Sequence, residues 1–498
     1  MIAGNISIVT PLLALVVIAQ NAESQIPGDL LLKDVDILER AYTAMHAGLY
    51  RYQSQAQSKA GFASLRMRLK NGTSLREAYL TFSEFAATIH CGHTYANFYN
   101  QETEVVRALF KGRNRVPFLF QWIGGRMVIT RWVGELPSLP PGTEIQAING
   151  ISCKSIFSKL MKITRADGAN DYKRRAYLNV EGNDKWEAFD IFLPLYYPSI
   201  ANSVEVKFRR VSSTKSETLR VNLMTAEERL KAVKPPTDID AQWQFLLDQN
   251  NIGHLRMPTW ALYNSKWDWQ TFLAKTFAQL TDSQAKGLII DLRGNEGGID
   301  VGDEILRYIV ATRTEFSAMQ RFTRYKKADL ALNDYLDTWD RSFLDWGSDA
   351  KNPTFNPRGN AVFYRMTRFD DGASSNTVEV AKTRFAGKLV VLMNSDNSSA
   401  TFQFEQKLQS HHLGTLVGEP SGGNLRGING GAFFFLHLPN SHIEMDLPLV
   451  ATLPISAQPD CGLLPDVAAS PTRADIAQGR DRAMETAEAL IVGAHKKS

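Results

Sequence analysis

The spacing of hydrophobic positions changes twice along the chain and divides it into three regions. In residues 30–102, apolar side chains recur every three or four positions, which is typical of amphipathic helices. From 103 to 230, short alternating runs predict strands, and the segments 139–142 (LPPG) and 149–150 (NG) predict tight turns between them. From 240 to 475, strand-length apolar runs alternate with helical patterns, as in β-α-β units. We therefore predict an α/β fold with a helical N-terminal region and a small β module.

The third region contains the most regular pattern. It predicts four strands, which lie at 251–257, 286–292, 388–393 and 415–418. It also predicts three helices, at 269–280, 300–312 and 399–411, and a hairpin formed by 433–438 and 442–447. An insertion at about 313–385, rich in arginine, aspartate and aromatic residues, interrupts the pattern, and 476–498 forms a C-terminal helix or tail.

Composition and charge narrow the function classes. The 498 residues include 44% hydrophobic and 22% charged side chains, which excludes disordered and fibrous proteins. Lysine and arginine (56) nearly balance aspartate and glutamate (52), so the net charge is only +4. Because a nucleic-acid-binding protein needs a strongly basic surface, we expect no nucleic-acid partner.

The start of the chain is apolar and uncharged. Residues 1–22 contain no charged side chain, and 8–19 are almost wholly hydrophobic. A run of about a dozen is shorter than the roughly 20 residues that a membrane-spanning helix needs, so we predict a cleaved signal peptide over 1–22. The mature protein would then be exported to the periplasm or the extracellular space, without an integral membrane span. The alternatives are a misassigned start and an uncleaved anchor.

Two segments of the third region have the residue types of a catalytic site. In 286–298 (KGLIIDLRGNEGG) a buried strand runs into glycines, whose backbone N–H groups could face a cleft as an oxyanion hole. The alternatives are a structural turn and a phosphate loop, although the GK[ST] signature of the latter is absent. In 388–409 a strand leads into a helix at Ser399. A serine at such a junction suits a nucleophile, but it is equally common as a helix cap.

Four segments in order, GLIIDLRGNEGG, NSSAT, LVGEPSGGN and CGLLPDV, resemble peptidase family S41. That family includes tail-specific proteases, tricorn-type core proteases and retinoid-binding repeats. The resemblance implies a crotonase-like catalytic core over 240–475, with Ser399 as the nucleophile. The N–H groups of Ala400 and of Gly297 or Gly298 would bind the oxyanion. The segment LPPGTEIQAING resembles part of a PDZ domain, which implies a PDZ-like module over 103–230.

The resemblance also bears on the general base. Asn424 stands where the tail-specific branch has a lysine, and Arg426 cannot release a proton at physiological pH. The tricorn-like branch uses a histidine upstream, and His93 in CGHTYANFY matches it. Asp460 is the candidate acid that orients the histidine, although that branch has glutamate there. Of the three cysteines, Cys91 and Cys461 flank these two residues, and they either form a disulfide bridge or remain free thiols.

We therefore expect a secreted serine-type peptidase, a hydrolase that cleaves peptides or unfolded proteins without metal or organic cofactor. The catalytic residues would be Ser399, His93 and Asp460. A non-catalytic protein that binds peptides or apolar ligands is the main alternative, and an esterase with the same acyl chemistry is a third possibility. His411 and His412 are interpreted as solvated residues at a helix end, and Glu296 as an exposed turn residue. The sequence does not indicate the oligomeric state.

Overall fold

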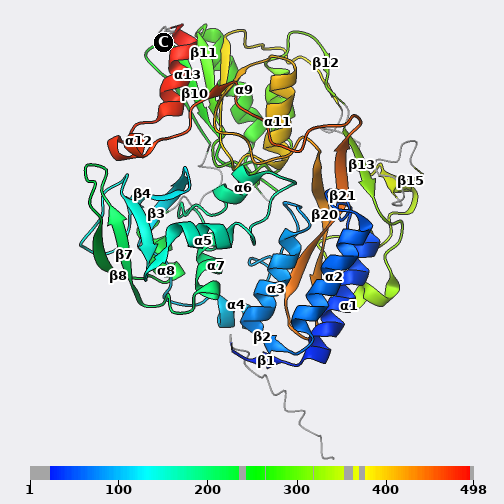
Figure 1. Cartoon of the computed structure of the whole chain (residues 1–498). Coiled ribbons are helices and arrows are strands. Elements are labelled where there is room, and N and C mark those ends of the chain that lie inside the picture. Colours follow the sequence, from blue (N-terminus) through cyan, green and yellow to red (C-terminus); the bar gives the residue numbers. More distant parts are fainter. Residues whose placement is uncertain are drawn as a thin grey trace, which may run out of the picture.

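A computed structural model gives the protein a mixed α/β fold (Figure 1). In the view of Figure 1 a central sheet with its helices lies at the top, a small β module at the lower left and the N-terminal helices at the lower right. The predicted signal peptide, 1–22, is outside the residues that the structure describes. Those residues are 23–234, 243–263, 265–317, 319–352, 363–369 and 376–493.

The central sheet has the order β22-β19-β18-β11-β10-β9 and is parallel except for the β9–β10 pair. The four strands that the apolar runs predict are confirmed as β10, β11, β18 and β19. The strand bounds are β9 (Gln244–Leu247), β10 (Ile252–Arg256), β11 (Gly287–Asp291), β18 (Lys388–Met393), β19 (Thr415–Gly418) and β22 (Val467–Ala468).

Helices cover both faces of the central sheet. Because side chains alternate along a strand, Leu288 and Ile290 of β11 face one core while Ile289 faces the other. The first core packs against α9 (Trp269–Asp282), α10 (Val301–Arg307) and α11 (Ser399–Ser410). The second packs against α13 (Arg482–Val492), which follows the short helix α12 (Arg473–Gln478). The burial of β11 on both faces explains its uninterrupted apolar sequence.

The N-terminal region is helical, as its apolar period predicts. Ser54 and Ser74 accept hydrogen bonds from the third backbone N–H of the helices that follow them, which fixes where those helices begin. The elements are β1 (Gln25–Ile26), α1 (Gly28–Met45), α2 (Gln55–Leu69), β2 (Thr73–Ser74), α3 (Leu75–Ala87) and α4 (Thr103–Leu109). The loop between α3 and α4 contains His93.

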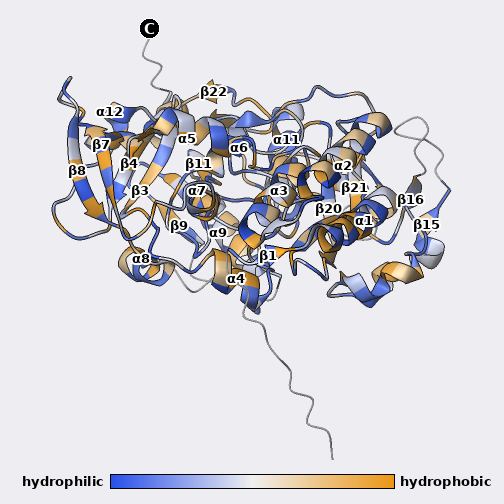
Figure 2. Cartoon of the chain, turned by 60° about the horizontal axis from the view of Figure 1, so that its bottom comes forward, coloured by the Kyte–Doolittle hydropathy of each residue, from blue (hydrophilic) through white to orange (hydrophobic). Residues whose placement is uncertain are grey.

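The small β module is an antiparallel sheet of order β3-β4-β5-β7-β8, with β6 paired to β5. Its hydrophobic and hydrophilic residues alternate along β7, which is visible in Figure 2. The strands are β3 (Phe118–Ile123), β4 (Arg126–Trp132), β5 (Glu144–Ile148), β6 (Ile151–Ser152), β7 (Ser203–Arg209) and β8 (Glu217–Asn222). The helices are α5 (Cys153–Leu160), α6 (Asp171–Ala176), α7 (Ala188–Tyr196) and α8 (Ala226–Val233).

A second antiparallel sheet has the order β14-β20-β21-β13-β16-β15, and its strand β21 contacts helix α1 of the N-terminal region. The predicted hairpin is confirmed as β20 (Ile428–His437) and β21 (Glu444–Pro454), both longer than the pattern indicates. The insertion contributes β12 (Thr314–Glu315), β13 (Met319–Thr323), β14 (Leu336–Asp337), β15 (Ala350–Lys351), β16 (Tyr364–Met366) and β17 (Thr377–Val378). Among the described helices, none combines the length and the hydrophobicity that crossing a bilayer requires.

Candidate active site

Ser399 lies where the chain turns from β18 into α11. Its φ angle is +53°, a left-handed conformation that costs energy for a residue with a side chain. The preceding Ser398 occupies the N-cap position but makes no capping hydrogen bond, and its hydroxyl donates instead to the carbonyl of Glu296 (3.1 Å). The first N–H groups of α11 therefore lack a side-chain cap. Ser399 does not act as the helix cap, which was the structural alternative to a nucleophile.

Gly297 packs directly against this junction. A Cβ atom at position 297 would lie 2.8 Å from the carbonyl oxygen of Ser398 and 2.9 Å from both the N atom of Ala400 and the Cβ of Ser399. The φ angle of Gly297 is +101°, which side chains other than hydrogen rarely allow. Glycine is thus required here by close approach as well as by backbone conformation.

The three predicted oxyanion residues differ in what their N–H groups do. The N–H of Gly297 donates to Oδ1 of Asn295 (2.9 Å) and is therefore already used. Gly298 forms a β-bridge with Trp260, but the N–H that bonds the Trp260 carbonyl there belongs to Ile299 (3.0 Å). Within the described residues, the N–H groups of Gly298 and Ala400 have no assigned acceptor, so this pair could serve an oxyanion.

Buried polar side chains hold the glycine turn and the start of α11 together. Asn397 donates to the carbonyls of Leu292 (2.6 Å) and Asn295 (3.0 Å). Asn295 in turn accepts from the hydroxyl of Thr401 (2.9 Å) and donates to the carbonyl of Met257 (2.8 Å). All three side chains, Asn295, Asn397 and Thr401, are fully buried. Because every bond satisfies a buried group, the network fixes the glycine turn against the start of α11.

His93 lies in the loop after α3, and its ring is 5.8 Å from that of Phe433 on β20. Its Nδ1 atom is inaccessible to solvent and has no hydrogen-bond partner among the described residues. Burial lowers the pKa of His93 to about 4, and the carboxylate of Asp167 offsets only part of this effect. The imidazole is therefore neutral at pH 7, the state in which it can accept a proton.

The β20–β21 hairpin contacts the histidine loop along its length. Asn429 of β20 donates to the Sγ of Cys91 (3.2 Å), and the side chain of Asn97 donates to the carboxylate of Asp446 on β21 (2.8 Å). The backbone N–H of Asp446 also donates to the carbonyl of Tyr95 (3.0 Å). The ring of Phe433 also contacts that of Trp339 in the insertion, with 5.9 Å between ring centroids and 44° between ring planes. The hairpin and the insertion thus support the loop that contains His93.

An ion pair between Lys173 and Glu296 connects helix α6 with the turn that contains Gly297. The ammonium group of Lys173 donates to Oε1 of Glu296 (2.9 Å) and to the carbonyl of Asp396 (2.8 Å). The Lys173 side chain is only 4% exposed, whereas that of Glu296 is 49% exposed, as expected of a turn residue. Glu296 precedes Gly297, and its charge also raises the pKa of His93. No hydrogen bond joins His93 to Ser399 in the described part of the chain.

Lys173 itself is unsuited to act as the base. Burial lowers its pKa, but the carboxylate of Glu296 and the ring of Tyr177 outweigh this effect and raise the pKa above the ordinary value. The side chain therefore stays protonated at physiological pH and stabilises the turn before Gly297 as a cation. Sequence analysis missed this residue because α6, on which it lies, has no catalytic motif.

Asp460 lies in a hydrogen-bond network of its own. Its Oδ1 accepts from the N–H of Ala169 (3.0 Å) and from the side chain of Asn424 (2.8 Å). The guanidinium of Arg426 lies 3.6 Å from its other oxygen. The described contacts do not link Asp460 to His93, so its orienting role stays a prediction. The carboxylate that acts most strongly on His93 is Asp167, which forms a buried ion pair with Arg51 and which no sequence motif indicated.

The structure resolves the alternatives for the cysteines. Cys91, Cys153 and Cys461 are all free, and the first two are buried whereas Cys461 is exposed. The bridge that would tie the histidine loop to the core is therefore not formed. The Sγ of Cys91 instead accepts the hydrogen bond from Asn429.

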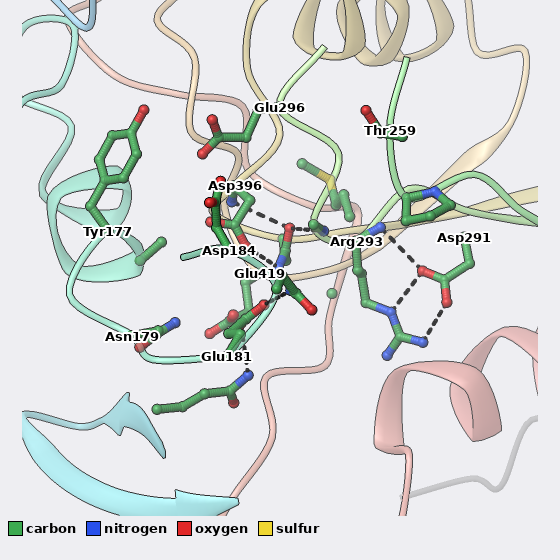
Figure 3. A pocket seen from close by; sticks show the side chains of 18 of the residues that line it. Tyr177, Asn179, Glu181, Asp184, Thr259, Asp291, Arg293, Glu296, Asp396 and Glu419 are labelled. Carbon is green, nitrogen blue, oxygen red and sulfur yellow. Dashed lines mark hydrogen bonds and ion pairs between the residues drawn. The ribbon is translucent and has the colours of Figure 1, made fainter. Parts of the chain in front are cut away.

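A cavity of about 920 Å³ adjoins the glycine turn, between the β module and the central sheet. Gly297 and Glu296 form part of its wall. Figure 3 shows Glu181, Asp396 and Glu419 on the same side as Glu296, and the ion pair of Arg293 with Asp291 apart from them. Burial, followed by the charge of Asp396, raises the pKa of Glu181 to about 8. The cavity therefore has an acidic wall beside Gly297, and neither Ser399 nor His93 is among its lining residues.

One family model matches part of the chain. Residues 251–431 match the model of Peptidase family S41, which confirms the resemblance inferred from the sequence over this segment. No curated protein matches the chain.

Two solved structures of CPAF show the same fold. Mature CPAF complexed with lactacystin has a TM-score of 0.62 at 14% identity, with 93% of this chain and 98% of that chain covered. Mature CPAF alone has a TM-score of 0.62 at 14% identity, over 93% and 96%. The photosystem II D1 C-terminal processing protease has a TM-score of 0.38 at 16% identity, over 92% and 98%. The family match supports a peptidase, hence a hydrolase, and does not favour the non-catalytic alternative.

Proposed function

We propose that the protein is a serine endopeptidase of the S41 type. The hydroxyl oxygen of Ser399 attacks the carbonyl carbon of a peptide bond while its proton passes to the neutral imidazole of His93, directly or through a water. The N–H groups of Ala400 and Gly298 stabilise the oxyanion. His93 then donates the proton to the leaving amine, and water hydrolyses the acyl-enzyme by the same route in reverse.

One observation carries this proposal: the strained backbone of Ser399 at the uncapped start of α11, in contact with Gly297. A helix cap would adopt an extended conformation and bond the helix backbone, as Ser54 does at α2. Strain of this kind persists where the surrounding structure enforces it, and it is typical of nucleophiles at strand-to-helix turns. Ligand binding without catalysis does not require this strained conformation of Ser399.

The substrate would be a peptide or an unfolded protein segment. We propose that the sheet of the β module is PDZ-like and holds the substrate as a strand added at β8, because β8 is an outer strand whereas the outer edge of β3 is already bonded to Val180 and Asn179. We also propose that the central sheet with its helices is a crotonase-like core. The cavity provides space for the substrate on one side of Gly297, and Gly297 itself packs against Ser399.

Export of the protein is a further part of the proposal. It is supported by the uncharged apolar segment 1–22 of the sequence. N-terminal sequencing of the protein recovered from a secreting host tests it. The expected mature N-terminus lies near residue 20, and a chain that keeps Met1 in the cytoplasm would contradict export.

A covalent probe tests the nucleophile. We expect a fluorophosphonate to label the wild-type protein and Ser398→Ala but not Ser399→Ala. Ser398 is the matched control because it is the neighbouring serine and its hydroxyl is already bonded to Glu296. Equal labelling of Ser399→Ala and the wild type would contradict the proposal. Parallel assays with an unfolded protein and with a simple ester distinguish a peptidase from an esterase.

The orienting acid can be tested in the same assay. Asp460→Asn and Asp167→Asn each remove one candidate carboxylate while keeping the shape of the side chain. The substitution that removes the carboxylate orienting His93 should lower kcat by about 10²- to 10⁴-fold. The substitution of the other aspartate should leave kcat unchanged. Equal, small effects of both substitutions would mean that His93 acts without an orienting acid.

A further inference from the structure

Three side chains that could bind a metal ion converge outside the proposed catalytic site: Glu102, His437 and His442. The Nδ1 of His437 lies 3.1 Å from Oε1 of Glu102, and the Nδ1 of His442 lies 3.1 Å from Oε2. One ligand atom from each of the three residues lies within 4.8 Å of those of the other two. The three residues are partly exposed, so an ion could reach them from solvent.

Distant parts of the chain assemble this cluster. Glu102 directly precedes α4, His437 ends β20, and His442 belongs to the turn that leads into β21. His442 has a φ angle of +59°, a left-handed conformation that histidine seldom adopts. The imidazole rings are 5.9 Å apart at 65°. The hairpin turn therefore presents both imidazoles to one carboxylate.

The distances suit a tetrahedral transition-metal ion. Zinc binds imidazole nitrogen and carboxylate oxygen at about 2.0–2.2 Å, so two of its ligand atoms lie about 3.3 Å apart. The two N–O distances of 3.1 Å are close to this value. Two histidines and one glutamate are a ligand set of zinc proteins, whereas calcium and magnesium prefer oxygen ligands only.

Glu444 is a candidate for a fourth ligand, although its carboxylate is not among the three groups that lie within 4.8 Å of one another. Glu444 of β21 is the cross-strand partner of His437, so the two side chains share one face of the hairpin. Its Oε1 is buried and has no hydrogen-bond partner among the described residues. Gln101 bonds the backbone of Glu444 in both directions, at 2.8 and 3.1 Å, which holds that strand beside Glu102.

We propose that Glu102, His437 and His442 bind one zinc ion, with Glu444 or water as the fourth ligand. The ion would tie the tip of the β20–β21 hairpin to the segment that continues from His93, only nine positions upstream of Glu102 in the sequence. Because metal binding stabilises the folded form that contains the site, it would also stiffen the histidine loop. The site would be structural and not catalytic.

Zinc titration of the full-length mature protein tests this site. Calorimetry should show one zinc ion bound per chain, and zinc should raise the Tm of the wild type whereas magnesium should not. Cobalt should give the visible absorption of a tetrahedral complex. The variants His437→Ala and His442→Ala should weaken zinc binding by at least about 10- to 100-fold.

Two further variants make the test decisive. His254→Ala is the matched control, because His254 also pairs with one carboxylate, that of Asp248 at 3.4 Å, and should leave zinc binding unchanged. Glu102→Gln preserves side-chain shape and covers the case in which an alanine variant fails to fold. Absence of zinc binding to the wild type, or equal binding by all the variants, would overturn the proposal. Labelling of Ser399 is independent of these results, so the two proposals can fail separately.

Discussion

The turn that contains Ser399 and the loop that contains His93 are held by different kinds of contact. The serine turn is built from adjacent parallel strands, β11 and β18, and from neutral side-chain amides that bond nearby backbone carbonyls. The histidine loop is supported by a hairpin, by the insertion and by buried charges from elsewhere in the chain. The first is held by two neighbouring strands and the turns that follow them, and the second depends on contacts from several parts of the molecule.

This difference indicates which side of the site is rigid. A fully satisfied network of buried hydrogen bonds resists displacement, so the proposed nucleophile and the proposed oxyanion donors are positioned before substrate binds. On the other side, the Nδ1 of His93 is buried without a partner. The histidine loop is therefore the element that has to adjust when the substrate binds.

The largest expected effect comes from removing the base. His93→Ala should lower kcat by about 10³- to 10⁴-fold, because in the proposed mechanism the imidazole of His93 accepts the proton of Ser399. His412→Ala is the control and should leave kcat unchanged. Steady-state kinetics on a peptide substrate measure both. A loss of less than about threefold in His93→Ala would show that the histidine side is structural only.

The next effect concerns the rigid side. Gly297→Ala should lower kcat by about 100-fold or more, since its Cβ would press on Ser398, Ser399 and Ala400. Gly294→Ala is the matched control: φ there is also positive, at +83°, but nothing lies within 4 Å of the added Cβ. Both variants share the conformational cost of a left-handed alanine. Equal kinetics of the two would contradict a close fit at Gly297.

The pH dependence distinguishes a buried base from an exposed one. Because burial lowers the pKa of His93 to about 4, its imidazole stays neutral until the pH approaches that value. The acid limb of kcat/KM should therefore fall near pH 4, well below the value of about 6.5 for an ordinary histidine. A pH profile with several overlapping buffers measures it. An acid limb at pH 6.5 would mean that His93 is exposed in the free enzyme.

The smallest effect concerns the helix behind the nucleophile. Glu405 of α11 is fully buried, neither carboxylate oxygen has a partner among the described residues, and burial raises its pKa well above 4.5. The folded state then binds a proton that the unfolded state releases, so stability falls as the pH rises above about 4.5. Glu405→Gln should reduce this fall by about 1 kcal/mol or more between pH 5 and pH 8. Urea unfolding at both pH values measures it, and an unchanged difference would contradict it.

The parts of the molecule that local sequence determines were predictable. The apolar runs of β10, β11, β18 and β19 identify the central sheet because buried parallel strands lack alternation. The glycine turn and Ser399 lie in contiguous segments, so motif and structure coincide there. The hairpin was predicted too short, because the first residues of β20 lie before a bulge between Gly430 and Phe433.

The parts assembled from distant segments were not predictable. Lys173 and Glu296 are 123 positions apart, and nothing in either local sequence indicates an ion pair. Asp167 lies in a loop without a motif, and its effect on His93 follows from folding alone. The ligands of the proposed zinc site could not be recognised from the sequence for the same reason, because Glu102 and the two histidines are more than 300 positions apart. Charge clusters of this kind have no periodic pattern in the sequence.

The β20–β21 hairpin has a consequence for inhibitor discovery. It bonds Cys91 through Asn429, packs Phe433 on His93 and receives Asn97 at Asp446, so it borders the histidine loop from one end to the other. A small molecule that binds between the β20–β21 hairpin and the histidine loop is expected to inhibit the enzyme without contacting Ser399. Such compounds would escape every screen that relies on competition with an active-site warhead.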